Sequence, residues 1–188
     1  SPFSSRFWNR LQRKSTDSAS ELDPLEEWMR LHILEDCLHR YADLIPTDIL
    51  QSVWADTVNI VTTLSPTGVG SSQISLAPLR VLGACARAMH QTQCGAPPID
   101  VHAFLIEAFH SAVPARQEAI LDALAAIVQY GCVSDMTLVW SFLVPPRTAH
   151  ADVQQHLRLL LDHPVALLNL VGSCLNACPP SDLTERLR

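Results

Sequence analysis

Apolar residues recur at spacings of three and four along most of the chain, which is the period of an amphipathic α-helix. Alternation typical of a strand is almost absent, and the best strand candidate, residues 60–63, continues a helical stripe. The clearest stripe lies in residues 24–45 and places these side chains on one helix face: Leu25, Trp28, Met29, Leu34, Cys37, Leu38, Tyr41 and Leu44. The pattern predicts an all-α fold.

Prolines and capping residues mark where the predicted helices begin and end. The chain has 13 prolines, and nearly all stand at such boundaries. Asp23 is a suitable N-cap, Pro24 fits the first helical position, Glu26 completes a capping box, and Gly131 stands where a C-terminal cap is expected. Asp100 and Ser134 are read as further N-caps. These signals predict helices over about 24–45, 47–64, 76–90, 100–112, 114–130, 134–144, 149–162 and 164–177, with another beginning at 181–185.

The tryptophans give a specific expectation for the core. A short connection at Pro46 joins the first two of these helices, so they should lie antiparallel and face one another. Trp28 and Trp54 fall on the facing stripes and are expected to be buried close together. Trp140 also lies on a predicted apolar face and is expected in the core.

The spacing of the helices suggests an architecture. After residue 100 the predicted starts fall near 101, 115, 135, 150, 165 and 182, so alternate starts lie 30–35 residues apart. This rhythm is typical of stacked helical hairpins. We therefore predict antiparallel helix pairs stacked as a helical-repeat-like solenoid fragment, similar in architecture to HEAT and armadillo stacks. No repeated side-chain motif accompanies the period, and a compact irregular helical bundle is the alternative.

Length and composition fit a globular chain. The 188 residues are 48% apolar and 17% charged, which excludes extensive disorder, and one domain is the usual expectation at this size. We predict three parts: a basic amphipathic helical segment at 1–14, a flexible linker at 15–22, and an all-α domain at 23–188.

The segment 1–14 differs from the rest of the chain. It contains four basic residues and no acidic one, although the whole chain has a net charge of −6. As a helix it would carry an apolar stripe on one side and the basic residues on the other. A helix this short cannot bury such a stripe alone. The candidate partner-binding residues are Phe3, Arg6, Phe7, Trp8, Arg10, Leu11 and Arg13.

Several surfaces could take this stripe. A groove on a protein partner fits an amphipathic helix, and self-association is a further option. The stripe could instead pack on the chain's own domain or on a neighbouring part of the parent protein. An anionic membrane or nucleic-acid phosphates could also attract the arginines. Four charges without a basic domain behind them make a poor footprint, so we expect neither nucleic acid nor membrane as partner.

Cysteines and histidines do not form a recognisable metal motif. Cys85, His90 and Cys94 have the spacing C-x4-H-x3-C, and Cys174 and Cys178 lie one helical turn apart, but the compact knuckles of structural zinc sites are absent. We expect no zinc and no cofactor. The six cysteines, spread thinly through apolar patterns, are typical of buried free thiols and indicate an intracellular protein, nuclear or cytoplasmic. Most of the eight histidines are expected at the surface or at helix ends.

Signatures of catalysis are also missing. The sequence has no nucleophile elbow, phosphate loop, dinucleotide fingerprint or zinc-protease motif. The hypothesis is therefore a protein–protein interaction or scaffold module, part of a larger protein or complex, with no catalysis of its own. Two alternatives stay open. One is a nucleic-acid- or chromatin-associated helical domain that uses the basic segment, and the other is a helical enzyme with a dispersed active site.

Overall fold

The computed structural model describes residues 24–63, 76–95, 99–145 and 150–177. Helix accounts for 81% of these residues, and no strand occurs among them, which confirms the all-α prediction. The segment 1–14, the linker 15–22 and the helix start at 181–185 lie outside the described residues. The elements are α2 (Pro24–Arg40), η1 (Ala42–Leu44), α3 (Thr47–Thr63), α4 (Ala77–Gln91), α5 (His102–Phe109), α6 (Pro114–Gln129), α7 (Met136–Leu143), α8 (His150–Leu161) and α9 (Pro164–Ala177).

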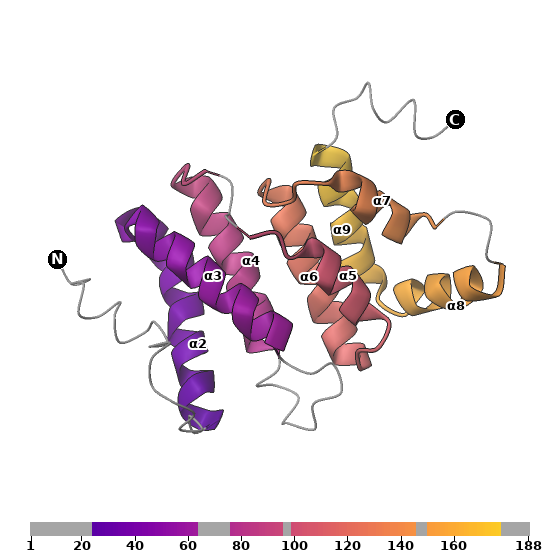
Figure 1. Cartoon of the computed structure of the whole chain (residues 1–188), viewed down its shortest axis with the longest axis horizontal. Coiled ribbons are helices and arrows are strands. Elements are labelled where there is room, and N and C mark those ends of the chain that lie inside the picture. Colours follow the sequence, from indigo (N-terminus) through magenta and orange to yellow (C-terminus); the bar gives the residue numbers. More distant parts are fainter. Residues whose placement is uncertain (1–23, 64–75, 96–98, 146–149, 178–188) are drawn as a thin grey trace. The chain divides into compact units, whose positions relative to one another are not determined.

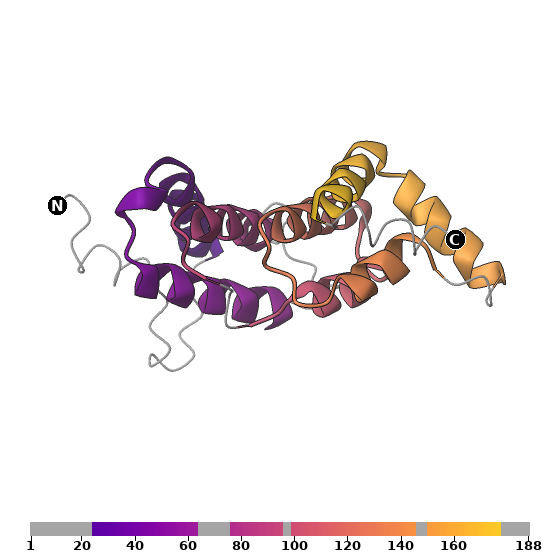
Figure 2. The ribbon, with the colours of Figure 1, turned by 90° about the horizontal axis from the view of Figure 1, so that it is seen from above.

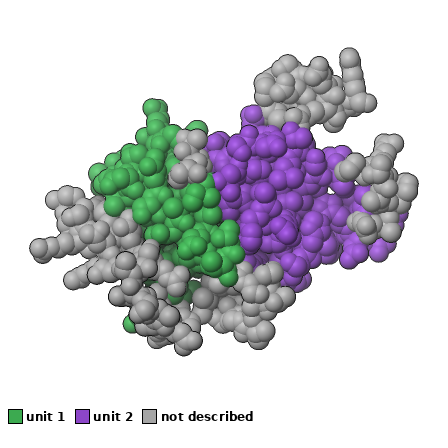
Figure 3. All heavy atoms as spheres, in the orientation of Figure 1, with its two compact units in different colours: residues 1–99 green, residues 100–188 purple. Residues whose placement is uncertain are grey.

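The chain divides into two compact units, Ser1–Ile99 and Asp100–Arg188 (Figure 3). Each unit has its own buried side chains and is described by itself below. The two units are distinguished by their internal contacts, and this does not establish that each folds independently. The single domain expected over 23–188 therefore stays a prediction.

Helix α4 is the centre of the first unit. It packs against α2 and against α3, and η1 also contacts it (Figure 1). Because α4 is rich in alanine, its neighbours can approach closely on two sides. Its exposed polar residues, Arg80, Arg87, His90 and Gln91, lie on one side of the helix, and the other sides face the core. Its buried residues are Ala77, Pro78, Leu79, Val81, Leu82, Ala84, Cys85, Ala86, Ala88 and Met89.

The predicted face of α2 is wrong in its first half. Trp54 is fully buried as expected, but Trp28 is half-buried, with its ring 4.6 Å from that of His32. Instead of forming a close antiparallel pair with α3, α2 packs on α4, and six residues including η1 connect the two helices. Its buried side chains are Leu31, Leu34, Cys37 and Leu38, whereas Leu25 and Met29 are exposed. The helix ends at Arg40, short of the predicted 45, and Tyr41 and Leu44, which follow it, are exposed as well.

Helix α6 is the centre of the second unit. It packs against α5 and, most extensively, against α9. Helix α7 contacts α5 and α9, and α8 contacts α9. Figure 2 shows α5 beside α7 and α6 beside α9. The buried residues of α6 are Arg116, Gln117, Ile120, Leu121, Ala123, Leu124, Ala125, Ile127 and Val128. Trp140 of α7, expected in the core, is half-buried.

Both central helices end in the same backbone motif. After α6, Gly131 takes a φ of 73°, its N–H donates to Val128 O at 3.2 Å, and Cys132 N–H donates to Ile127 O at 2.8 Å. This is a Schellman cap, and it confirms the expected role of Gly131. After α4, Gln93 occupies the corresponding position with a φ of 53°. A residue with a Cβ is therefore held in the left-handed region there, at an energetic cost.

Gln93→Gly should raise the free energy of unfolding by about 0.5–1 kcal/mol, because glycine adopts positive φ without steric strain. Gly131→Ala is the matched opposite change and should lower it by about 1 kcal/mol. No heavy atom lies within 4 Å of a Cβ built on Gly131, so only backbone strain is added. Urea unfolding of both variants measures the effect. Equal effects of the same sign would contradict this account of the two caps.

Candidate functional site

The partner-binding residues expected in segment 1–14 lie outside the described residues, so that expectation stays a prediction. Two kinds of feature elsewhere could carry a function. One is a set of polar clusters in the second unit, each of which contains at least one buried side chain. The other is a pair of exposed apolar faces, one on α2 and one on α9.

The first polar cluster surrounds Asp100. Its carboxylate accepts hydrogen bonds from the ring Nδ1 of His102 and from the Ser134 hydroxyl, together with the backbone N–H groups of both residues at 3.3 and 3.2 Å. Burial by itself would raise the pKa of the Asp100 carboxyl, but the hydrogen bonds from Ser134 and His102 outweigh it and lower the pKa. The ionised Asp100 side chain therefore links the start of α5 to the loop before α7 through hydrogen bonds.

This cluster contains Ser, His and Asp but lacks the geometry of a catalytic triad. In a triad the histidine lies between the carboxylate and the serine, and it removes the hydroxyl proton. Here Asp100 lies between the other two, and the Ser134 hydroxyl donates to the carboxylate. The buried Nε2 of His102, where a nucleophile would stand, has no hydrogen-bond partner among the described residues. The arrangement is suited to holding two chain segments together.

A second cluster joins α5, α7 and α8. Nε2 of His156 lies 2.6 Å from the carbonyl oxygen of Phe142, so Nε2 carries the proton and donates it. In this tautomer Nδ1 of His156 accepts from Nε2 of His110 at 2.9 Å. The rings of Phe109 and Phe142 pack edge-on against this pair. Burial, followed by the charge of His156, lowers the pKa of His110. His156 is buried within α8, so it is an exception to the expectation that most histidines lie at the surface or at helix ends.

A third polar contact ties α5 and α9 to α6. The buried amide of Gln117 donates from Nε2 to Phe109 O at 3.1 Å, and its Oε1 lies 3.2 Å from Nε2 of His163. His163 precedes α9 at a helix junction, as expected, but it is buried. The Gln117 amide and the His163 ring therefore have hydrogen-bond partners inside the core, which is the usual arrangement of structural polar residues.

Most of the cysteines that the structure describes are buried thiols. Cys37, Cys85, Cys132 and Cys174 are buried, as expected, and Cys94 is half-buried. Burial and the nearby Asp100 charge raise the pKa of Cys132 to about 11. Burial and Asp36 likewise raise the pKa of Cys37. A protonated thiol is a poor nucleophile and a poor metal ligand. In residues 24–177, outside the gaps stated above, no three His, Cys, Asp or Glu side chains are placed to hold a metal.

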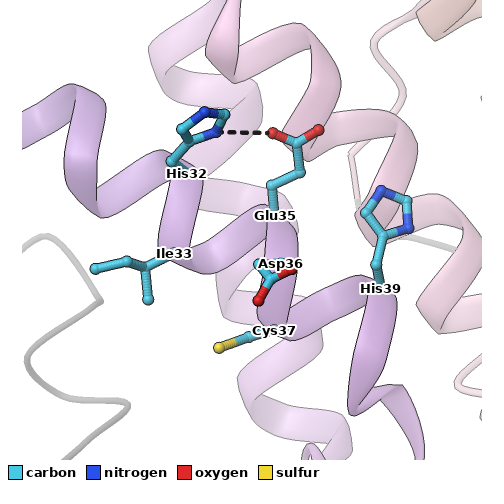
Figure 4. A pocket seen from close by; sticks show the side chains of 6 residues that line it. All are labelled: His32, Ile33, Glu35, Asp36, Cys37 and His39. Atoms are coloured by element: carbon cyan, nitrogen blue, oxygen red, sulfur yellow. Dashed lines mark hydrogen bonds and ion pairs between the residues drawn. The ribbon is translucent and has the colours of Figure 1, made fainter.

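The outer face of α2 is apolar along its first turns. Leu25, Met29 and Ile33 follow one another at spacings of four and are exposed. A shallow hollow of about 520 Å³ opens beside them, lined by His32, Ile33, Glu35, Asp36, Cys37 and His39 (Figure 4). In it Glu35 contacts Nδ1 of His32 at 3.3 Å and Arg80 of α4 at 3.6 Å. Asp36, which also lines the hollow, pairs with Arg40 at 2.7 Å, so both carboxylates of the hollow are engaged in ion pairs.

The outer face of α9 is apolar and uncharged. Helix α9 contains no Asp, Glu, Lys or Arg in its 14 residues. Val165, Leu168 and Leu175 are 70%, 69% and 44% exposed, and Gly172 stands between the last two. Leu161, at the end of α8, is also exposed. The sequence pattern predicts a helix here but does not predict this surface. The sequence feature that could have indicated this surface is the absence of any charged residue from a helix of this length.

No single helix among the described residues is long and apolar enough to cross a membrane. Two successive helical segments, 153–161 and 164–177, are together long and apolar enough, but they are bent by 102° at the break between them.

Comparison with known proteins found no matching family model, no matching curated protein and no matching solved structure. The function therefore has to be inferred from the residues themselves.

Proposed function

We propose that the chain is a protein-interaction module, part of a larger protein or complex, with no catalysis of its own. The exposed apolar face of α9 carries this proposal. Folded chains rarely leave several large apolar side chains together in water unless a partner covers them. The fit is to a partner α-helix, because Val165, Leu168, Gly172 and Leu175 have the 3-4-3 spacing of a coiled-coil seam.

The polar groups support binding over catalysis. Asp100, Gln117 and His156 each hold two parts of the fold together through hydrogen bonds inside the second unit. None of these clusters pairs a nucleophile with a base. The alternatives of a nucleic-acid-associated domain and of a dispersed active site gain no support from the residues described.

We also propose the finer architecture, a helical-repeat-like stack. Within the second unit, α5 pairs with α6 and α7 pairs with α9, while α5 contacts α7 and α6 contacts α9. Two hairpins stacked in this way form two layers, as in a solenoid, and α8 is an insertion within the second hairpin. In such a stack the outer face of α9, the last helix that the structure describes, is equivalent to faces that neighbouring repeats cover elsewhere, and this makes it a natural docking face.

The experiment is a pull-down with the purified chain, comparing Val165→Glu with Val144→Glu. Both valines are 70% exposed, so the two variants change surface charge equally, but Val144 lies at the end of α7. A partner held by the α9 face should lose most of its binding to Val165→Glu and keep it with Val144→Glu. Equal capture by both variants would remove α9 as the docking face.

The segment 1–14 is tested separately by replacing Phe7 and Trp8 with Ala. If it docks on a partner, association weakens while the melting temperature of the domain stays nearly unchanged. If the melting temperature falls sharply and binding persists, the stripe belongs to the core. Because the two sites lie in different parts of the chain, the two sets of variants assign any captured partner to one of them.

A further inference from the structure

We infer that the outer face of α9 pairs with the same face of a second copy of this chain, antiparallel across a twofold axis. The inference rests on the proposed function in one respect, because it needs this face to be an interaction surface. It goes further by naming the occupant.

The order of large and small residues along the seam makes it self-complementary. In an antiparallel pair centred level with residue 170, Val165 of one copy lies opposite Leu175 of the other. Leu168 then lies opposite Gly172, and the symmetric copies of both contacts follow automatically. One register therefore fits both pairs, since both have the same midpoint. Antiparallel coiled coils pair their two seam positions in this way.

Gly172 supplies the space that this register needs. No heavy atom lies within 4 Å of a Cβ built at this position, so the surface is open there. Glycine is an unfavourable residue in the middle of a helix and needs a compensating reason. A leucine from the other copy, inserted opposite it, would let the two backbones approach closely and would cover the exposed backbone at the glycine.

The charge of the face also suits a second copy. At a twofold axis every charged residue near the axis meets its own like charge. Helix α9 has no charged residue, so this repulsion is absent. The polar residues bordering the seam are Asn169 and Asn176, which are exposed and neutral, so they add no repulsion between like charges.

The seam is short, so the pair should be weak. The ten residue steps from Val165 to Leu175 span about 15 Å of helix, and stable protein interfaces are larger than such a contact provides alone. We expect a reversible dimer whose population rises with concentration, rather than an obligate one.

Sedimentation velocity over about a hundredfold range of concentration tests the inference, using the full chain and three variants. Gly172→Leu places two leucines opposite one another and should weaken self-association by about tenfold or more. It should also raise the melting temperature, because leucine is the better helix former, and this separates lost pairing from lost folding. Val165→Glu should likewise give a monomer, and Val144→Glu should behave as the unaltered chain.

The decisive variant exchanges the two residues, Leu168→Gly with Gly172→Leu. Its composition and helix propensity match those of the unaltered chain, and the large residue again faces the small one across the axis. Self-association should return close to its original strength. Loss of pairing in the exchange variant as severe as in Gly172→Leu alone would overturn the antiparallel register.

Other results would overturn the dimer itself. These are a monomer at every concentration, or a dimer that Gly172→Leu and Val165→Glu leave intact. A monomer that binds phosphatidylcholine vesicles through this face would also overturn it. A monomer that captures another protein through α9 would leave the proposed function standing without the dimer. A dimer that captures no other protein would leave the dimer standing without the proposed function of binding a partner protein.

Discussion

Trp54→Ala should lower the free energy of unfolding by about 3–5 kcal/mol. The side chain is fully buried in α3, and truncation leaves a cavity beside the alanine-rich α4, whose small residues cannot fill it. The indole Nε1 also donates to Ile99 O at 2.8 Å, so the variant loses the hydrogen bond that ties the residues before α5 to α3.

Trp54→Phe separates these two contributions. It keeps most of the buried ring and removes the donor, so it should cost only about 1 kcal/mol. Urea or guanidinium denaturation followed by circular dichroism measures both variants. A loss below about 1 kcal/mol for Trp54→Ala would contradict the placement of this ring in the core.

The helices of this chain can be predicted from its sequence because their end signals are local. Pro24, Pro114 and Pro164 each begin a helix, and Gly131 ends one. After residue 100, every expected start within the described residues lies within two residues of the observed one. A proline or a left-handed glycine acts through its own backbone, so no knowledge of distant residues is needed.

The faces of the helices could not be predicted as well. In the first half of α2, apolar residues occur all round the helix, so spacing alone does not distinguish Leu31 and Leu34 from Leu25 and Met29. Packing against α4, which is distant in sequence, determines which of these side chains are buried. The cap of α7 shows the same limit. Ser134 was the expected N-cap, but Asp135 accepts from Thr137 N–H at 2.8 Å, because Asp100 engages the Ser134 hydroxyl.

The sequence contains an indication of the polar clusters. His102, Gln117 and His156 each stand within the apolar stripe of their helix, where a leucine would be expected. A polar residue at such a position needs a partner in the core. The partner itself could not be deduced, since His110 and His156 are 46 residues apart. The α9 face was missed for a different reason, because a stripe of apolar residues looks the same in sequence whether or not a helix covers it.

Phe109→Ala is expected to cost about 3–5 kcal/mol in the second unit. Phe109 is fully buried at the end of α5, with its ring centroid 5.3 Å from that of Phe142 and 6.5 Å from that of His156. Truncation opens a cavity beside the histidine pair. Its carbonyl can still accept from Gln117, so the loss reports on packing.

The same variant should change a pKa. Burial is the main cause that lowers the pKa of His110, and water entering the cavity would raise that pKa toward its ordinary value. In the unaltered chain the folded state binds this proton less readily than the unfolded state does. The contribution of His110 to stability is therefore present above its ordinary pKa and is lost as the pH falls below it, toward the lowered value. In Phe109→Ala this dependence on pH should shrink, and NMR titration of the His110 ring measures the pKa directly.

Phe109→Leu is the control, since it retains most of the buried volume and should cost under about 1.5 kcal/mol with little change in the His110 pKa. Hydrogen exchange followed separately in residues 24–95 and 99–177 shows how far the damage of Phe109→Ala extends. If residues 23–188 fold as one domain, both regions lose protection together, because the unfolding is cooperative. Loss of protection confined to residues 99–177, with the region around Trp54 unchanged, would make the two compact units two separate folding domains.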